Sequence, residues 1–135
     1  MTEFNQLAAG IVLLTVIGIA YGGTFLLTVV NGAVPANTLQ RNYFRAGHAH
    51  AGVLVTLGLL VQVVIATPNV PSWAATLGSG VLWSAILIPA GFFLSVIGKD
   101  PEKPNAWKYS IWLGAAALTV GLAGAGVGLI TASAS

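Results

Sequence analysis

The chain has 135 residues, of which 56% are hydrophobic and 6% are charged, and its formal net charge at neutral pH is +2. About a quarter of the residues in a soluble domain are charged, so this composition excludes an ordinary soluble domain. The basic residues form no stripe of the kind that binds nucleic acid, and no nucleic-acid partner is expected. The absence of cysteine excludes disulfides, thiolate-ligated haem and cysteinyl iron–sulfur clusters.

Four apolar runs are long enough to cross a bilayer, which takes about 20 residues of helix. These runs span residues 7–30, 43–66, 73–97 and 106–131. The first run is too long for the core of a cleavable signal peptide and follows no basic region. Because the connecting segments are short, neighbouring helices must run antiparallel. The sequence therefore predicts an all-α integral membrane protein, a single antiparallel bundle of four transmembrane helices surrounded by membrane lipid.

Proline, glycine and basic residues predict the orientation of this bundle in the cell membrane. The first loop, 31–42, begins at Asn31-Gly32, and the third loop, 98–105, contains two prolines. Every basic residue lies in or beside one of these two loops, namely Arg41, Arg45, Lys99, Lys103 and Lys108. The positive-inside rule then places loops 31–42 and 98–105 in the cytoplasm and both termini outside.

Glycines recur at helical spacing in the first and fourth runs, as Gly18 with Gly22 and Gly124 with Gly128. Small residues four apart let helix backbones approach closely in lipid. Two interpretations remain open: the glycines pack the bundle internally, or the face from Gly114 to Gly128 contacts another subunit. A bundle this small has little interior volume, so a buried cofactor fits more easily between subunits, and we expect a homo-oligomer.

Both histidines lie in the segment Arg45–Gly52, at the start of the second run. In one continuous helix His48 and His50 point about 200° apart, because each residue turns the helix by about 100°. They could converge on one metal only if the helix began after His48. No third nitrogen, sulfur or buried carboxylate is available to complete a tetrahedral zinc site.

A single histidine is sufficient for haem, because the macrocycle supplies four ligands to the iron itself. Small residues surround His50 and leave open space for a flat macrocycle. Arg41 and Arg45 are candidates to pair with haem propionates, or else they anchor the helix at the cytoplasmic surface. The alternative for each histidine is an interfacial side chain that is hydrogen-bonded to a backbone carbonyl or a lipid headgroup. Gln62 lies about 18 Å further along the helix, and we expect it to form an interhelical hydrogen bond.

Several segments resemble the styrene oxide isomerase family, small four-helix membrane proteins that bind haem b through one histidine between the subunits of a trimer. Leu26–Val34, which runs through Asn31-Gly32, is similar to the end of that family's first helix. Arg45–Gly52 resembles the Arg-Ala-His-Ser-Gly opening of its second helix. Leu77–Ser79 and Gly91–Ser95 are similar to parts of its third helix. The likeness covers roughly the middle two-thirds of the chain.

The resemblance implies a role for both histidines. It makes His50 the axial ligand of haem b, and it puts His48 at the position of the family's arginine, beside Arg41 and Arg45 as a possible propionate contact. It also implies a trimer. The implied reaction is the rearrangement of an epoxide to a carbonyl compound, with the ferric iron acting as a Lewis acid on the epoxide oxygen.

The polar residues that line the substrate in this family are replaced here. Where the family has an asparagine on the second helix and an aspartate and a tyrosine on the third, this chain has Thr56, Ser84 and Phe92. Thr56 and Ser84 can still form hydrogen bonds, so the resemblance implies them as candidate catalytic residues that line the substrate. Phe92 cannot form such a bond, and no carboxylate remains.

Two other functions are compatible with the sequence. The first is a haem electron-transfer protein, whose second axial ligand would come from another chain or from His48 of a neighbour. The second is a non-catalytic small subunit or scaffold of a larger membrane complex, which would bind through the glycine-rich face. A small transporter would typically have paired charges in mid-membrane and discontinuous helices, and the sequence has neither.

Overall fold

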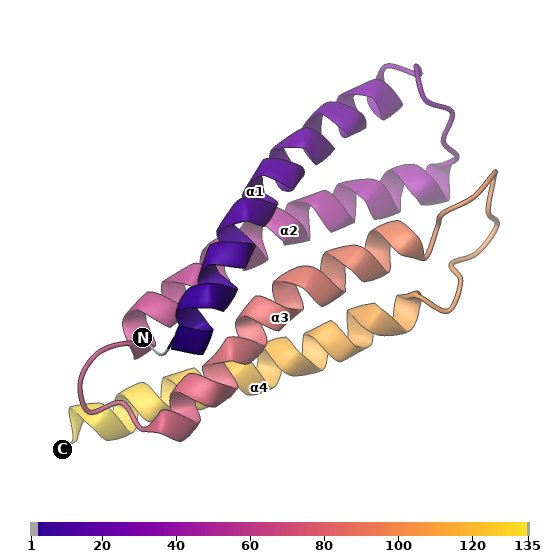
Figure 1. Cartoon of the computed structure of the whole chain (residues 1–135). Coiled ribbons are helices and arrows are strands. Elements are labelled where there is room, and N and C mark those ends of the chain that lie inside the picture. The colour runs from indigo at the N-terminus through magenta and orange to yellow at the C-terminus, as the bar shows by residue number, and fades with distance from the viewer. Residues whose placement is uncertain (1–2, 135) are drawn as a thin grey trace.

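The computed structural model describes residues 3–134, which form four α-helices (Figure 1). The helices are α1 Glu3–Val30, α2 Thr38–Ile65, α3 Ser72–Leu94 and α4 Lys108–Ser133. Each helix is long and apolar enough to cross a membrane. Consecutive helices run antiparallel, so both ends of the described chain lie at one end of the molecule (Figure 1). The prediction of an all-α protein with four helices that are long and apolar enough to span a membrane is confirmed.

α2 begins earlier than predicted, at Thr38 rather than at residue 43. The reason is a capping box at Asn37. The Asn37 side chain accepts a hydrogen bond from the backbone N–H of Gln40 at 2.9 Å, and the Gln40 side chain accepts one from the backbone N–H of Asn37 at 3.1 Å. Residues 38–42, which the sequence places in the first loop, therefore form the start of α2.

α3 ends earlier than predicted, at Leu94 instead of residue 97. Asn105 from the following loop occupies the end of this helix. Its side-chain amide donates to the carbonyl of Leu94 at 2.9 Å, and its backbone N–H donates to the carbonyl of Ser95 at 2.7 Å. These bonds satisfy carbonyls that lack partners at the end of a helix. They also turn the chain back toward α4.

The four helices pack in chain order, with α3 in contact with α2 on one side and α4 on the other. α1 crosses α2 and diverges from the other helices (Figure 1). Within the described residues α1 makes no contact with α4, so the arrangement is more open than a closed bundle. The main buried core lies between α1, α2 and α3. It consists of Val12, Leu54, Val55, Leu82, Ala85 and Ile88.

The glycine-rich face of α4 packs against α3. A Cβ atom added at Gly121 would lie 2.8 Å from the backbone nitrogen of Val81, and added Cβ atoms at Gly124 and Gly128 would also clash with α3. On the α3 side, a Cβ at Gly80 would lie 2.6 Å from a carbonyl oxygen of α4. The two backbones therefore meet directly, as small residues allow in lipid. For the glycines of α4 the interpretation of internal packing is confirmed, whereas a Cβ at Gly18 of α1 would meet no atom within 4 Å.

Gln62 does not form the interhelical hydrogen bond that the sequence predicts. Its side chain is 1% exposed, and neither its Nε2 nor its Oε1 has a hydrogen-bond partner among the described residues. The prediction is wrong: the neighbours of Gln62 along α2, Val61 and Ile65, lie beside Gly78 of α3, which has no polar side chain to offer. The carboxamide is left unpaired in the interior.

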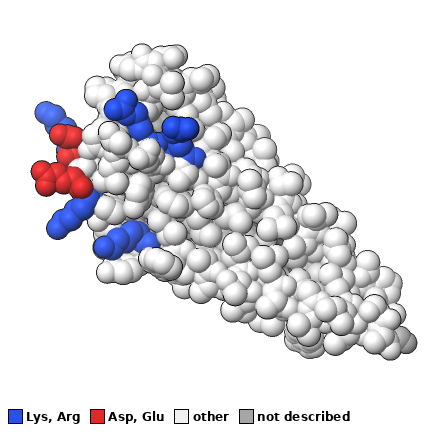
Figure 2. All heavy atoms as spheres, turned by 180° about the vertical axis from the view of Figure 1, so that it is seen from behind, with Lys and Arg blue, Asp and Glu red and all other residues white. Residues whose placement is uncertain are grey.

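All the basic residues, together with Asp100 and Glu102, gather at one end of the molecule, which is the end formed by loops 31–37 and 95–107 (Figure 2). Polar side chains from the start of α2 hold these two loops together. The Gln40 amide donates to the carbonyls of Val96 at 3.1 Å and Gly98 at 3.0 Å. The predicted first and third loops therefore lie at the same end of the molecule.

Candidate functional site

His50 presents one free ring nitrogen at the surface of α2. Its Nδ1 lies 2.7 Å from the carbonyl oxygen of Ala46, one turn earlier in the helix. Because a carbonyl oxygen only accepts, the neutral ring carries its proton on Nδ1 and its lone pair on Nε2. The side chain is exposed, so Nε2 is accessible. Metal-binding histidines commonly have this arrangement, in which a carbonyl orients the ring and selects its tautomer.

Aromatic rings support the imidazole of His50. The ring of Phe92, from α3, lies with its centroid 5.2 Å from that of His50 at an interplanar angle of 30°. Tyr43 meets Phe92 edge-on, with centroids 5.5 Å apart. We call Tyr43, Ala46, His50 and Phe92 the His50 patch.

Tyr43 and Phe92 were not identified as neighbours of His50 from the sequence. Tyr43 precedes His50 by two helical turns and so shares its face, and this spacing is visible in the sequence. Phe92 matches a family position, but its contact with His50 depends on how α3 packs against α2.

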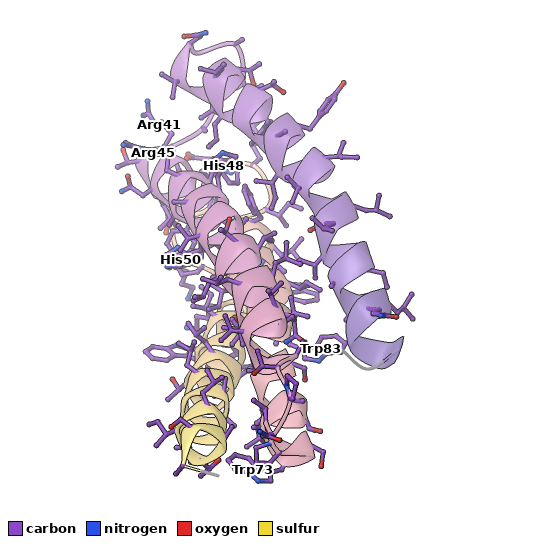
Figure 3. All side chains as sticks on the ribbon, turned by 90° about the vertical axis from the view of Figure 1, so that its left-hand side faces the viewer. Arg41, Arg45, His48, His50, Trp73 and Trp83 are labelled. Carbon is purple, nitrogen blue, oxygen red and sulfur yellow. The ribbon has the colours of Figure 1, made fainter. Side chains whose placement is uncertain are left out.

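His48 lies between α1 and α2, on the opposite side from His50 (Figure 3). Two glycines of α1 make room for its ring. A Cβ at Gly22 would lie 3.4 Å from Nδ1 of His48, and one at Gly23 would lie 3.5 Å from Nε2. Because α2 is continuous through both histidines, the two rings do not converge. Within the described residues no group of three His, Cys, Asp or Glu side chains could hold a metal ion.

Arg41 and Arg45 lie on the face of α2 that carries His48. On a regular helix Arg45 is turned about 140° from His50, and Arg41 about 180°. Both side chains are exposed at the charged end of the molecule (Figure 3). Within one chain, therefore, the arginines and His48 do not face the same side of α2 as His50.

The two candidate catalytic hydroxyls are hydrogen-bonded within their own helices. Thr56 donates to the carbonyl of Gly52 at 2.9 Å, and its side chain is turned about 120° from His50. Ser84 is fully buried and donates to the carbonyl of Val81 at 2.7 Å. Of the three positions matched to the family's polar residues, Phe92 is the one that contacts the His50 ring among the described residues.

No protein-family model matches the chain, and neither a curated protein nor a solved structure matches it. The resemblance to styrene oxide isomerases therefore rests on the short sequence segments described above. What the geometry itself contains is an exposed imidazole with an oriented ring, a free Nε2 and an aromatic neighbour.

Proposed function

We propose that this chain is an integral membrane protein that binds haem b through Nε2 of His50. The observation that carries this proposal is the bond between Nδ1 of His50 and the carbonyl of Ala46. In the neutral imidazole that bond puts the proton on Nδ1 and the lone pair on Nε2, and it holds the ring in place, which suits an axial ligand. The exposure of the ring keeps the approach to Nε2 open.

Haem fits this site better than a bare metal ion. His50 offers one nitrogen, and no cluster of further ligands accompanies it in the described residues. The bound group must then supply most of the metal ligands itself, as haem does. The residues next to His50 on the same exposed surface, Ala49 and Val53, are small or apolar, which suits a flat apolar macrocycle.

The position of His50 also supports an oligomer. Its ring faces the outside of the fold, so haem bound there would be covered only by lipid or by another subunit. We therefore propose that the haem lies between copies of this chain, in a trimer if the resemblance holds. Arg41 and Arg45 of one copy would reach propionates only across such an interface, because within one chain they face away from His50. His48 is less suited to this role, because its ring lies between α1 and α2 of its own chain.

The proposed activity is the rearrangement of an epoxide to a carbonyl compound. When bound, the haem iron would supply a Lewis-acid position for the epoxide oxygen. The chain would contribute His50 as the ligand and the Ala46 carbonyl as the group that orients it. Phe92 would form an apolar wall that excludes water and so favours rearrangement over hydrolysis. Tyr43 supplies the one phenol of the His50 patch.

Electron transfer is a second candidate function. It is favoured by the placement of Thr56 and Ser84, whose hydroxyls are bonded within their own helices rather than held at His50. An electron carrier needs the iron ligand but no acid or base beside it. By contrast, the glycine-rich face of α4 is buried against α3, so it is not available to bind a partner as a scaffold would require.

The distribution of the basic residues supports an orientation as well. We propose that the end with loops 31–37 and 95–107 faces the cytoplasm and that both termini lie outside the cell membrane. The basis is the gathering of the basic residues at that end (Figure 2).

An absorption spectrum tests the haem proposal. The wild type, His50→Ala and the matched control His48→Ala would be purified in mild detergent and supplied with haem. We expect a Soret band in the wild type and in His48→Ala, and its loss in His50→Ala. A colourless wild type, or a band that survives in His50→Ala, would contradict the proposal. Turnover of an aryl epoxide by the ferric protein would then separate an isomerase from an electron carrier.

A further inference from the structure

A cavity of about 280 Å³ separates the first part of α1 from the middle of α3. We call it the α1–α3 groove. Its walls include Ala8, Ile11 and Val12 from α1 and Leu82, Trp83 and Ile86 from α3. Trp83 lies between α3 and the N-terminal part of α1 (Figure 3).

The groove has no free hydrogen-bonding hydroxyl and no charged side chain to bind a polar ligand. Ser79 is its one polar lining residue, and the Ser79 hydroxyl already donates to the carbonyl of Thr76 at 2.6 Å. The remaining lining residues are apolar and none is charged. The basic residues lie at the opposite end of the molecule (Figure 2). An occupant would therefore be apolar where it enters the groove, and no charge on the protein would attract an anionic headgroup.

The α1–α3 groove has the dimensions of a small-molecule pocket. Its volume is close to the lower end of small-molecule pockets, which begin at about 300 Å³.

The place of the groove identifies the hydrocarbon that reaches it. Both walls belong to helices that can cross a membrane. The α3 wall lies about 10 to 21 Å from the start of that helix, which is within the apolar interior of a bilayer. Trp83 is 52% exposed and Ile86 is 43% exposed, so the groove opens sideways. We propose that it binds one acyl chain of an uncharged or zwitterionic membrane lipid.

Trp83 provides the means to test this proposal. Phenylalanine would replace the other three tryptophans, and the protein would be reconstituted in phosphatidylcholine vesicles with a small fraction of lipid brominated in mid-chain. We expect the quenching of Trp83 fluorescence to saturate at a low fraction of brominated lipid. In Ala8→Phe, which fills the groove from α1, we expect quenching at that fraction to fall at least twofold. Ile86→Phe, which fills it from α3, should give the same loss.

Gly10→Phe is the matched control, because a Cβ at Gly10 meets no atom within 4 Å and the residue does not line the groove. It should leave quenching unchanged, and circular dichroism would show that all variants keep their helices. Equal quenching in the wild type and both filled variants would overturn the proposal. So would stronger quenching by brominated phosphatidylglycerol than by the zwitterionic lipid. A change of oligomeric state in Ala8→Phe with unchanged quenching would assign the groove to a second copy instead.

Discussion

The side-chain amide of Asn37 lies 2.9 Å from the Asp100 carboxylate, across 63 residues of sequence. The same amide nitrogen donates to the carbonyl of Pro101 at 2.8 Å, while the Asn37 oxygen caps α2 by accepting from Gln40. One side chain therefore begins a helix and holds the third loop against the first. This contact joins the first loop to the third loop, which carries Lys99, Asp100, Glu102 and Lys103.

Removal of the Asn37 side chain should destabilise the protein. Asn37→Ala loses the cap of α2 and the bonds to the third loop. A lost cap costs about 0.5–2 kcal/mol, so we expect a decrease of about 1–2 kcal/mol in the free energy of unfolding. Circular dichroism during titration from mild detergent into a denaturing detergent would measure it. Asn42→Ala is the control, because Asn42 is exposed on the same helix. Equal losses in both variants would contradict the role of Asn37.

The direct approach of α3 and α4 makes Gly124 intolerant of a side chain. A Cβ there clashes with the side chain of Leu77, whereas a Cβ at Gly126 meets no atom within 4 Å. Gly124→Ala should lower the free energy of unfolding by about 1–3 kcal/mol, as overpacked cores do. Gly126→Ala should raise it by up to about 1 kcal/mol, because alanine favours helix over glycine. The same detergent titration compares the two variants. An unchanged free energy of unfolding in Gly124→Ala would mean that α3 and α4 are further apart than in this structure.

The two buried glutamines of α2 should respond oppositely to the same change. Gln62→Met replaces an unpaired carboxamide by an apolar side chain of similar shape, so we expect a gain of about 1–3 kcal/mol in the free energy of unfolding. Gln40→Met removes the bonds to Asn37, Val96 and Gly98 and should reduce it. A loss of stability in Gln62→Met would show that Gln62 has a partner, such as a bound water.

The absence of cysteine makes the proposed orientation easy to test. Thr67→Cys places a thiol in the exposed second loop, and Glu102→Cys places one in the exposed third loop. In intact cells a membrane-impermeant maleimide should label Thr67→Cys and leave Glu102→Cys unmodified until the membrane is opened. The reverse pattern would place the charged end outside.

The sequence by itself determined the class of the protein and its four helices. A bilayer requires about 20 apolar residues per span and requires every backbone group to be paired within the span, so composition and run length were sufficient. The divergence of His48 and His50 was also predictable, because it depends only on the turn of one helix. The early start of α2 was not predicted, because the start of the helix was placed at the start of the apolar run. The capping residues Asn37 and Gln40, which precede that run, are visible in the sequence.

The tertiary structure decided everything that depends on how the helices meet. It placed Phe92 beside His50, left Gln62 without a partner, buried the glycine face of α4 against α3 and opened the groove at Trp83. The physical reason is that lipid, rather than water, surrounds the helices. In lipid an apolar side chain gains little by moving from the surface to a helix interface. The pattern of apolar residues therefore does not specify which face is buried, and the detailed fit of small and large side chains decides it.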